Sequence, residues 1–399
     1  MISRSLALMF LLVMGLASLG SSRTAFAQTF TTIHDFDQSG FEPLAGLVVD
    51  KSGNLYGTTS TGLSAFAGTV FEMSPNGTGW DFSTLYTFTV GADGGLPQGS
   101  LALDSAGNLY GTTSDVNGTG GTVFELSPAG GGAWTYKLVH TFTDNPDGFD
   151  PLANVILDAQ GNLYGTTAGG GTSEFGTVFE LSPNGSGGWN ESILYNFKGG
   201  SDGRNPQCGL VFDATGNLYG TTEFGGSSDQ GTVFQLTPNG DGTWQETILS
   251  SLNSHTGYHP EAGLAIDKKG NLYGTTVSNA TVFELSPLGD GKWTKKVIHT
   301  FQGLQGDGTD PQAPLTVGVN GALYGTTLSG GNQACECGTV FQLTRASNGT
   351  WTERILYNFT VQNGDEPRGA VVFDAVGNLY GTTKYGNNGF GSVFEISRH

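Results

Sequence analysis

The sequence predicts an all-β fold: a closed seven-bladed β-propeller with four antiparallel strands in each blade. Two observations support this fold class: a repeat of nearly fixed length, and a chain that opens and closes with complementary parts of one repeat unit. The heptapeptide GNLYGTT marks the repeat and occurs six times, and once more as GALYGTT. Its tyrosines, 51 to 56 residues apart, are Tyr56, Tyr110, Tyr164, Tyr219, Tyr273, Tyr324 and Tyr380. Such a period is typical of propellers and solenoids.

The third repeat shows the four strands of one unit. Residues 151–158 (PLANVILD), 162–167 (NLYGTT), 176–182 (GTVFELS) and 189–197 (WNESILYNF) are rich in apolar, β-branched and aromatic residues. The DAQGN and SPNGSGG segments between them are turn sequences. Four strands with turns about every ten residues predict one antiparallel sheet per repeat. Seven such sheets can bury their faces against one another when they are stacked radially.

The two ends of the chain choose between a closed ring and an open solenoid. Residues 30–36 (FTTIHDF) match a fourth strand, and residues 391–397 (GSVFEIS) match a third strand with no fourth strand after it. We therefore expect the N-terminal strand to complete the seventh blade, which closes the ring and removes two exposed sheet edges. A linear solenoid would need polar capping repeats instead.

The first 27 residues have the pattern of a signal peptide. Arg4 precedes an apolar stretch over residues 6–19, and Ala25-Phe26-Ala27 fits a cleavage site. We expect cleavage after Ala27 and a single propeller domain over residues 28–399; an uncleaved anchor is the alternative. The protein is then secreted, periplasmic or displayed at the cell surface, with no membrane span after signal removal. We expect a monomer.

The chain is acidic and has few charged residues. Its net charge is −19 at pH 7, and 13% of its 399 residues are charged. Loss of Arg4 and Arg23 with the signal peptide makes the remainder more negative. Such a protein repels nucleic acids and anionic membranes, which leaves cations, neutral glycans and basic proteins as partners.

Two repeated features have both a structural and a functional interpretation. The tryptophans share one position of the fourth strand and are expected to wedge between blades, with sugar stacking as the alternative. They are Trp80, Trp134, Trp189, Trp244, Trp293 and Trp351. The aspartate of the DxxGN turn, such as Asp158, is expected to bind turn amides, with calcium binding as the alternative. Gly318 replaces it in the sixth repeat without loss of the strand pattern, which favours the turn.

Taken together, GNLYGTT, GTVFEL, the tryptophan and ILYNF resemble the GloVer-type tandem-repeat family of secreted bacterial proteins, over nearly all of residues 28–399. The resemblance implies a secreted, propeller-like repeat protein. Members of that family often carry varied C-terminal anchors, which are not expected here because His399 directly follows the last repeat. The resemblance brings no catalytic residues.

The loops that join the fourth strand of one blade to the first strand of the next, the rim loops, follow the pattern [DSTN]-G-x-x-P. Proline fixes the start of the inner strand and biases the residue before it to an extended conformation. That residue varies: Glu42, Leu96, Asp150, Asn205, His259, Asp310 and Glu366. We expect these side chains to form a ring at one mouth of the central channel. The loops between second and third strands (2–3 loops) should share that face.

Variation within a rigid frame is where a binding site can be built. Three neighbouring blades would gather an acidic cluster of Glu42, Asp307, Asp310, Asp365 and Glu366, with Arg368 beside it. Its carboxylates could hold calcium through Asp307, Asp310 and Glu366, or supply an acid/base pair for glycoside hydrolysis. A solvated acidic rim is the structural alternative.

The remaining candidates are histidines and cysteines. His255 and His259 lie in the fifth rim loop, where they could act as a general base or metal ligands or be exposed without a role. The histidines of the fourth strands, expected to be structural, are His34, His140 and His299. Cys208 is expected to be free and buried near the axis. Cys335 and Cys337 could form a disulfide in an oxidising compartment.

The sequence contains no motif of a serine hydrolase, metalloprotease, P-loop, dinucleotide-binding or EF-hand protein. We therefore expect a non-catalytic propeller that recognises an extracellular glycan or protein, without a cofactor unless calcium binds. The expected ligand-binding residues are Glu42, Asp150, Asn205, His259, Asp310, Glu366 and Arg368. The alternative is a secreted carbohydrate-active enzyme, a glycoside hydrolase or polysaccharide lyase, with the candidate catalytic residues Glu42, Asp310, Glu366 and His259.

Overall fold

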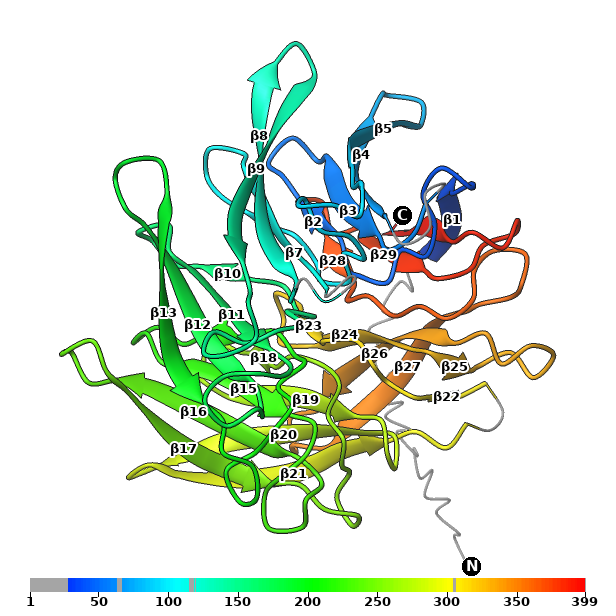
Figure 1. Ribbon diagram of the computed structural model, residues 1–399. Coiled ribbons are helices and arrows are strands. Elements are labelled where there is room, and N and C mark those ends of the chain that lie inside the picture. The colour runs from blue at the N-terminus through cyan, green and yellow to red at the C-terminus, as the bar shows by residue number, and fades with distance from the viewer. Residues whose placement is uncertain (1–27, 63–66, 115–117, 119, 304–305, 399) are drawn as a thin grey trace, which may run out of the picture.

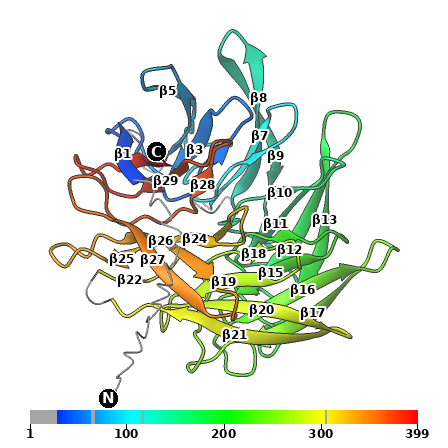
Figure 2. The same ribbon diagram turned by 180° about the vertical axis from the view of Figure 1, so that it is seen from behind.

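The computed structural model describes residues 28–62, 67–114, 118, 120–303 and 306–398. Its strands form seven four-stranded antiparallel sheets, arranged around a common axis as the blades of a propeller (Figures 1 and 2). This confirms the predicted all-β, seven-bladed fold. Within the described ranges, no helix is long and apolar enough to cross a membrane. The predicted signal peptide, residues 1–27, lies outside them.

The strands fall into four classes, from the axis outwards. The first strands are β2 (Val48–Val49), β6 (Ala102–Leu103), β10 (Ile156–Leu157), β14 (Val211–Phe212), β18 (Ala265–Ile266), β23 (Thr316–Val317) and β28 (Val372–Phe373). The second strands are β3 (Leu55–Thr59), β7 (Leu109–Thr113), β11 (Leu163–Thr167), β15 (Leu218–Thr222), β19 (Leu272–Thr276), β24 (Leu323–Thr327) and β29 (Leu379–Thr383).

The outer two classes are longer. The third strands are β4 (Thr69–Pro75), β8 (Thr122–Gly130), β12 (Thr177–Pro183), β16 (Thr232–Pro238), β20 (Thr281–Gly289), β26 (Thr339–Arg345) and β30 (Ser392–Arg398). The fourth strands are β5 (Trp80–Thr87), β9 (Ala133–Thr141), β13 (Trp189–Asn196), β17 (Trp244–Ser251), β21 (Lys292–Thr300), β27 (Trp351–Asn358) and β1 (Gln28–Asp35). A short extra pair, β22 (Gly308–Thr309) and β25 (Ser329–Gly330), lies at the sixth blade.

The innermost strands are shorter than the sequence predicts. Of the expected strand over residues 151–158, only Ile156–Leu157 pairs with β11. The segment before this pair turns towards the neighbouring blades around the axis. The Thr166 hydroxyl donates to the Cys208 carbonyl of the next blade at 3.1 Å. An added Cβ at Gly99 would lie 2.7 Å from the Ala153 carbonyl carbon. The inner segments therefore pack against one another instead of extending their own sheets.

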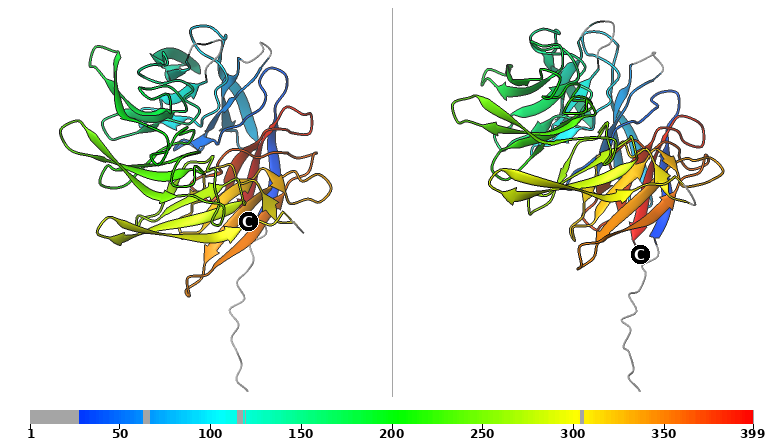
Figure 3. Two further views of the ribbon diagram at one scale, coloured as in Figure 1. Left: turned by 60° about the horizontal axis from the view of Figure 1, so that its bottom comes forward. Right: turned by 90° about the horizontal axis from the view of Figure 1, so that it is seen from below.

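The N-terminal strand completes the last blade, as predicted. Strand β1 pairs antiparallel with β30, from Gln28 opposite Arg398 to Asp35 opposite Ser392. Figure 3 shows this blue strand lying beside the red end of the chain. The Thr382 hydroxyl of the seventh blade also donates to the Ala45 carbonyl of the first at 2.8 Å. The ring is closed by hydrogen bonds at both its inner and its outer radius.

Apolar clusters between neighbouring blades form the core, and the heptapeptide fits this packing. An added Cβ at Gly165 would lie 2.5 Å from the buried Phe179 ring, so only glycine lets the third strand approach the second. The Trp189 ring packs edge-on against Tyr110 of the preceding blade, with ring centroids 6.1 Å apart. The structural interpretation of the tryptophans is therefore confirmed. At the seventh equivalent place, Gln28 accepts a hydrogen bond from Arg354.

The aspartates of the DxxGN turns bind the turn itself. Asp158 accepts hydrogen bonds from the backbone N–H groups of Gln160 and Asn162 at 2.9 Å each, and from the Tyr164 hydroxyl at 3.2 Å. In the sixth blade, where glycine replaces aspartate, the Tyr324 hydroxyl accepts hydrogen bonds from side chains of the third strands of the sixth and seventh blades, Gln342 and Arg398. These contacts support the structural interpretation of this position.

Candidate functional site

The rim loops and the 2–3 loops lie on the same face of the propeller and are hydrogen-bonded to each other. In the third blade, the Phe149 N–H donates to the Gly169 carbonyl at 3.0 Å, and the Gly169 N–H returns a bond to Phe149 at 3.2 Å. Corresponding bridges join Phe41 to Thr61 and Tyr258 to Ser278. Among the described residues, these bridges hold the two kinds of loop together around the mouth of the central channel.

All seven residues before the rim prolines adopt the left-handed conformation, which corrects the prediction that they are extended. Their φ angles lie between 49° and 62° at Glu42, Leu96, Asp150, Asn205, His259, Asp310 and Glu366. The backbone frame imposes this conformation. The His259 N–H donates to the Gln230 carbonyl of the preceding blade at 3.1 Å, while its own carbonyl accepts from Val277 at 3.2 Å. The adjacent proline does not override these bonds.

On one side of the mouth, acidic side chains are paired with cations. The Lys384 ammonium lies 3.7 Å from the Glu366 carboxylate and 3.9 Å from that of Glu42 in the next blade. The Arg368 guanidinium contacts Glu366 at 3.1 Å and donates to the Gln312 side chain at 3.3 Å. This row crosses three blades. The predicted cluster is therefore a mixed chain of charges and not a bare group of carboxylates.

On the other side, the acidic groups are partly buried and have few cationic neighbours. Glu223 accepts hydrogen bonds from the side-chain amides of Asn205, at 2.7 Å, and Gln207. Burial raises the pKa of Glu223, and burial followed by the charge of Glu223 raises the pKa of Glu261. Burial also raises the pKa of Asp310. On this side, among the described residues, Glu223 is therefore held by neutral amide donors and not by an ion pair.

Half-buried aromatic rings stand in the same loops as the polar residues of the mouth. They stand in the rim loops or 2–3 loops of five blades: Phe41, Phe149, Phe224, Tyr258 and Tyr385. The His259 ring lies between two of them, with centroid distances of 5.0 Å to Phe224 and 4.8 Å to Tyr258. The Lys384 ammonium lies 4.7 Å from the Tyr385 ring centroid. The central channel is a cavity of about 130 Å³ lined partly by glutamine, glutamate and arginine side chains.

Of the three residues proposed to bind calcium, Asp307 belongs to a different cluster of side chains. The carboxylate of Asp307 lies within 4.8 Å of the ligand atoms of His299 and Glu353, between the fourth strands of the fifth and sixth blades. Among the described residues, Asp307, Asp310 and Glu366 do not form a comparable group.

Cys335 and Cys337 form a disulfide, and Cys208 is free and buried beside the channel.

Several mouth residues were not found by sequence reasoning. Lys384 and Glu223 each follow a GNLYGTT heptapeptide directly, and Gln207, Glu261 and Gln312 each follow a rim proline. Aligning the seven repeats could have found these residues. The position after the heptapeptide and the position after the rim proline both vary between repeats as strongly as the residue before proline. The position after the heptapeptide holds Ser60, Ser114, Ala168, Glu223, Val277, Leu328 and Lys384.

The fold and this site define a class: a seven-bladed β-propeller with a polar channel mouth and half-buried aromatic residues in the loops of the same face. The chain belongs to the Gloeobacter/Verrucomicrobia repeat family, whose sequence model matches residues 22–223 and 209–399. No curated protein matches the chain.

Solved structures are similar in fold. Virginiamycin B lyase from Staphylococcus aureus is 13% identical with a TM-score of 0.59, and the match covers 94% of this chain and 100% of that one. The periplasmic gluconolactonase of Pseudomonas aeruginosa is 15% identical with a TM-score of 0.54, over 79% and 84% of the two chains. The extracellular domain of a one-component system of B. thetaiotaomicron is 13% identical with a TM-score of 0.55, over 94% and 42%. At these identities the likeness concerns the fold alone.

Proposed function

We propose that the protein is a non-catalytic carbohydrate-binding propeller that works outside the cytoplasm, and that it holds a neutral glycan at the framed mouth of the channel. One observation carries the proposal: half-buried aromatic side chains and polar side chains stand together in the loops of one face, and the loops are fixed by backbone bonds. The extracellular or periplasmic location rests on the signal-like N-terminus and on the family resemblance.

The aromatic and the polar side chains of this face match the apolar and the polar groups of a sugar. A pyranose exposes apolar C–H groups that pack on aromatic rings such as Tyr258 and Phe224, whose edges and faces are partly open. Its hydroxyl groups need paired donors and acceptors. These are present at the mouth as the Asn205 and Gln207 amides, the Glu366 carboxylate and its cationic neighbours.

The charge balance favours a neutral ligand over an acidic one. Lys384 and Arg368 are both engaged by the carboxylate of Glu366, and Arg204 pairs with Asp229 at 2.8 Å. An acidic sugar would have to displace these partners, and it would approach a chain with a net charge of −19. A neutral oligosaccharide meets neither obstacle.

The test is a neutral-glycan array, followed by calorimetric titration of the best ligand. Glu366→Gln removes an acceptor that organises two cations, and Tyr258→Ala removes an aromatic face. Each is expected to weaken binding about tenfold or more, equivalent to about 1.4 kcal/mol. Asp81→Asn, which also neutralises a carboxylate but is exposed at the start of strand β5, near the opposite face, is the matched control. Equal affinities for all three variants and the wild type would place the ligand elsewhere.

A carbohydrate-active enzyme remains the second candidate because of the raised pKa values of Glu261 and Asp310 at the mouth. A raised pKa favours the protonated form that a general acid requires. Polysaccharides that bind should then be cleaved by the wild type and not by Glu261→Gln or Asp310→Asn. If the glycans that bind are not degraded, the enzyme hypothesis fails and the binding proposal stands.

A further inference from the structure

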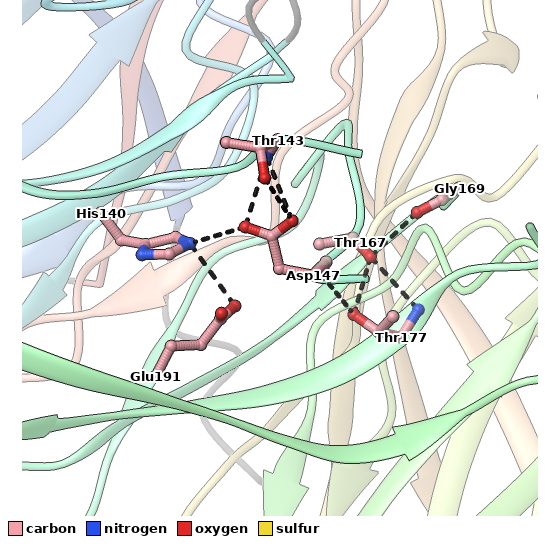
Figure 4. A network of polar contacts seen from close by, with 7 residues as sticks. All are labelled: His140, Thr143, Asp147, Thr167, Gly169, Thr177 and Glu191. Carbon is pink, nitrogen blue, oxygen red and sulfur yellow. Dashed lines mark hydrogen bonds and ion pairs between the residues drawn. The ribbon is translucent and has the colours of Figure 1, made fainter. Parts of the chain in front are cut away.

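The seven crevices between neighbouring blades repeat one three-residue arrangement outside the channel mouth. The first position is the Tyr/His site of one fourth strand, and the second is the first residue of the rim loop that follows it. The third lies on the fourth strand of the next blade, two residues after the tryptophan position. Two crevices place a histidine, an aspartate and a glutamate there. They are His140 with Asp147 and Glu191, and His299 with Asp307 and Glu353. Figure 4 shows the first set.

The first cluster is compact and rigidly held. His140 Nε2 lies 3.3 Å from Asp147 Oδ2 and 3.4 Å from Glu191 Oε1. Asp147 is fixed by Thr143, whose N–H and hydroxyl both donate to Oδ1, at 3.2 and 3.0 Å. Glu191 Oε1 is fully buried and makes no hydrogen bond.

The second cluster repeats this arrangement on the fifth and sixth blades. His299 Nε2 lies 3.6 Å from Glu353 Oε2, and both Nε2 and Glu353 Oε1 are buried without a hydrogen-bond partner. Asp307 is fixed by two backbone N–H groups, those of Gln302 at 2.6 Å and Gly308 at 2.8 Å. Buried polar atoms without partners are costly, and a bound cation would satisfy those of both clusters.

We propose that these two crevices are binding sites for a divalent transition-metal ion of the zinc type, one ion in each. One imidazole nitrogen and two carboxylate oxygens form a ligand set that zinc accepts, with water in the fourth position. Metal–ligand bonds of about 2.0 Å at tetrahedral angles separate neighbouring ligand atoms by about 3.3 Å. The distances around His140 already have this value. The threonine and backbone donors act as the outer shell that orients the ligands.

The other crevices show how the same place is filled without a metal. Between the fourth and fifth blades, the Lys295 ammonium occupies the glutamate position and donates to Thr256 at 2.9 Å. The crevice thus accommodates a positive charge supplied by the chain itself. Between the seventh and first blades, His34 stacks on Phe82 with centroids 4.1 Å apart, which leaves no ligand set.

The crevice between the third and fourth blades is a natural control. It has the same two acidic residues, Asp202 and Glu246, but Tyr195 stands in place of the histidine and donates to Asp202 at 2.7 Å. The variants His140→Tyr and His299→Tyr therefore copy an arrangement that this fold already contains. The reverse change, Tyr195→His, builds the proposed ligand set in a third crevice.

The experiment measures zinc stoichiometry by native mass spectrometry on tag-free protein that has been stripped with a chelator, reloaded with Zn²⁺ and desalted. We expect two zinc ions per chain for the wild type, one for each single tyrosine variant and none for the double variant. Tyr195→His is expected to bind three. Zinc should raise the unfolding temperature of the wild type and leave that of the double variant unchanged.

The absence of zinc from the wild type would overturn the proposal, as would a double variant that keeps both ions, since binding would then come from residues such as His255 or His259. Circular dichroism and the unfolding temperature without metal verify that the double variant is folded. A cobalt-loaded wild type should show the strong visible absorption of four-coordinate Co²⁺, and its absence would contradict the proposed geometry. The outcome is separate from glycan binding, because none of the residues proposed to bind the glycan belongs to either cluster.

Discussion

The side chain of Thr382 and the backbone carbonyl of Ala45 are joined by a 2.8 Å hydrogen bond, although the two residues are 337 positions apart in the sequence. The bond connects the last blade to the first. The same threonine position makes the same bond between other neighbouring blades, as from Thr166 to Cys208. In the fifth blade the equivalent Thr275 hydroxyl is buried and has no hydrogen-bond partner among the described residues.

This contrast predicts opposite effects for one substitution. Thr382→Val removes the donor and should lower the free energy of unfolding by about 1 kcal/mol. Thr275→Val removes a buried hydroxyl without a partner and should be neutral or stabilising. Denaturant unfolding of the two variants and the wild type measures both changes. Equal destabilisation by the two substitutions would show that the closing bond has no special energetic role.

The left-handed conformation before the rim prolines predicts a preference at Leu96. Leu96→Ile conserves volume but introduces a β-branched side chain at a φ of 49°, and it should lower stability by about 1–2 kcal/mol. Leu96→Met conserves volume without β-branching and should change stability by less than this. If the residue were extended, isoleucine would be accepted at least as well as methionine, so the order of the two unfolding temperatures decides between the conformations.

Much of the fold could be predicted because each repeat carries its own turn and strand signals. The heptapeptide, the turn aspartates and the tryptophans all occupy the predicted places, and the fragments at 30–36 and 391–397 indicated the closing pair. The short inner strands and the left-handed residues could not be predicted. Both result from contacts between different blades, which local propensity does not encode. Proline-based reasoning failed at Glu366 and its equivalents for the same reason.

The pKa of Glu246 predicts a pH-dependent stability. Burial, followed by the charge of Asp202, raises this pKa from 4.5 to about 7, although Lys198 opposes the shift. A raised carboxyl pKa means that the folded state binds the proton more tightly. Stability linked to Glu246 is therefore complete below pH 4.5 and is lost as pH rises through about 7.

Glu246→Gln removes this ionisation. The variant should gain stability relative to the wild type between pH 4.5 and 7, and the difference should stay constant above that range. Chemical denaturation at a series of pH values, in the presence of a chelator, provides the measurement. A difference in stability that does not change with pH would contradict the assignment.

The turn interpretation of the DxxGN aspartates predicts a cost that calcium does not affect. Asp158→Ala removes the acceptor of bonds from two backbone N–H groups and the Tyr164 hydroxyl. Stability should fall by about 1–3 kcal/mol, and thermal unfolding should show the same loss with and without added calcium. A loss that appears only in calcium would favour the metal interpretation instead.

The candidate site was only partly accessible from the sequence. The variable position before proline led to Glu42 and Glu366, but Lys384, which pairs with both, comes from a different loop. His140 occupies the Tyr/His position of a fourth strand, which predicts a structural role. Its neighbour Glu191 belongs to the next blade, and only the register of the folded sheets brings the two together. Both omissions concern contacts across blade boundaries, where sequence separation gives no indication of distance.

The most direct test of the account is hydrogen exchange of the protein with and without a saturating neutral oligosaccharide identified on the array. Binding at the mouth predicts slower exchange in the rim loop around Glu366 and in the 2–3 loop around Lys384, with no change in the turns between third and fourth strands. Protection confined to those turns, or no protection at the mouth, would contradict the proposed site.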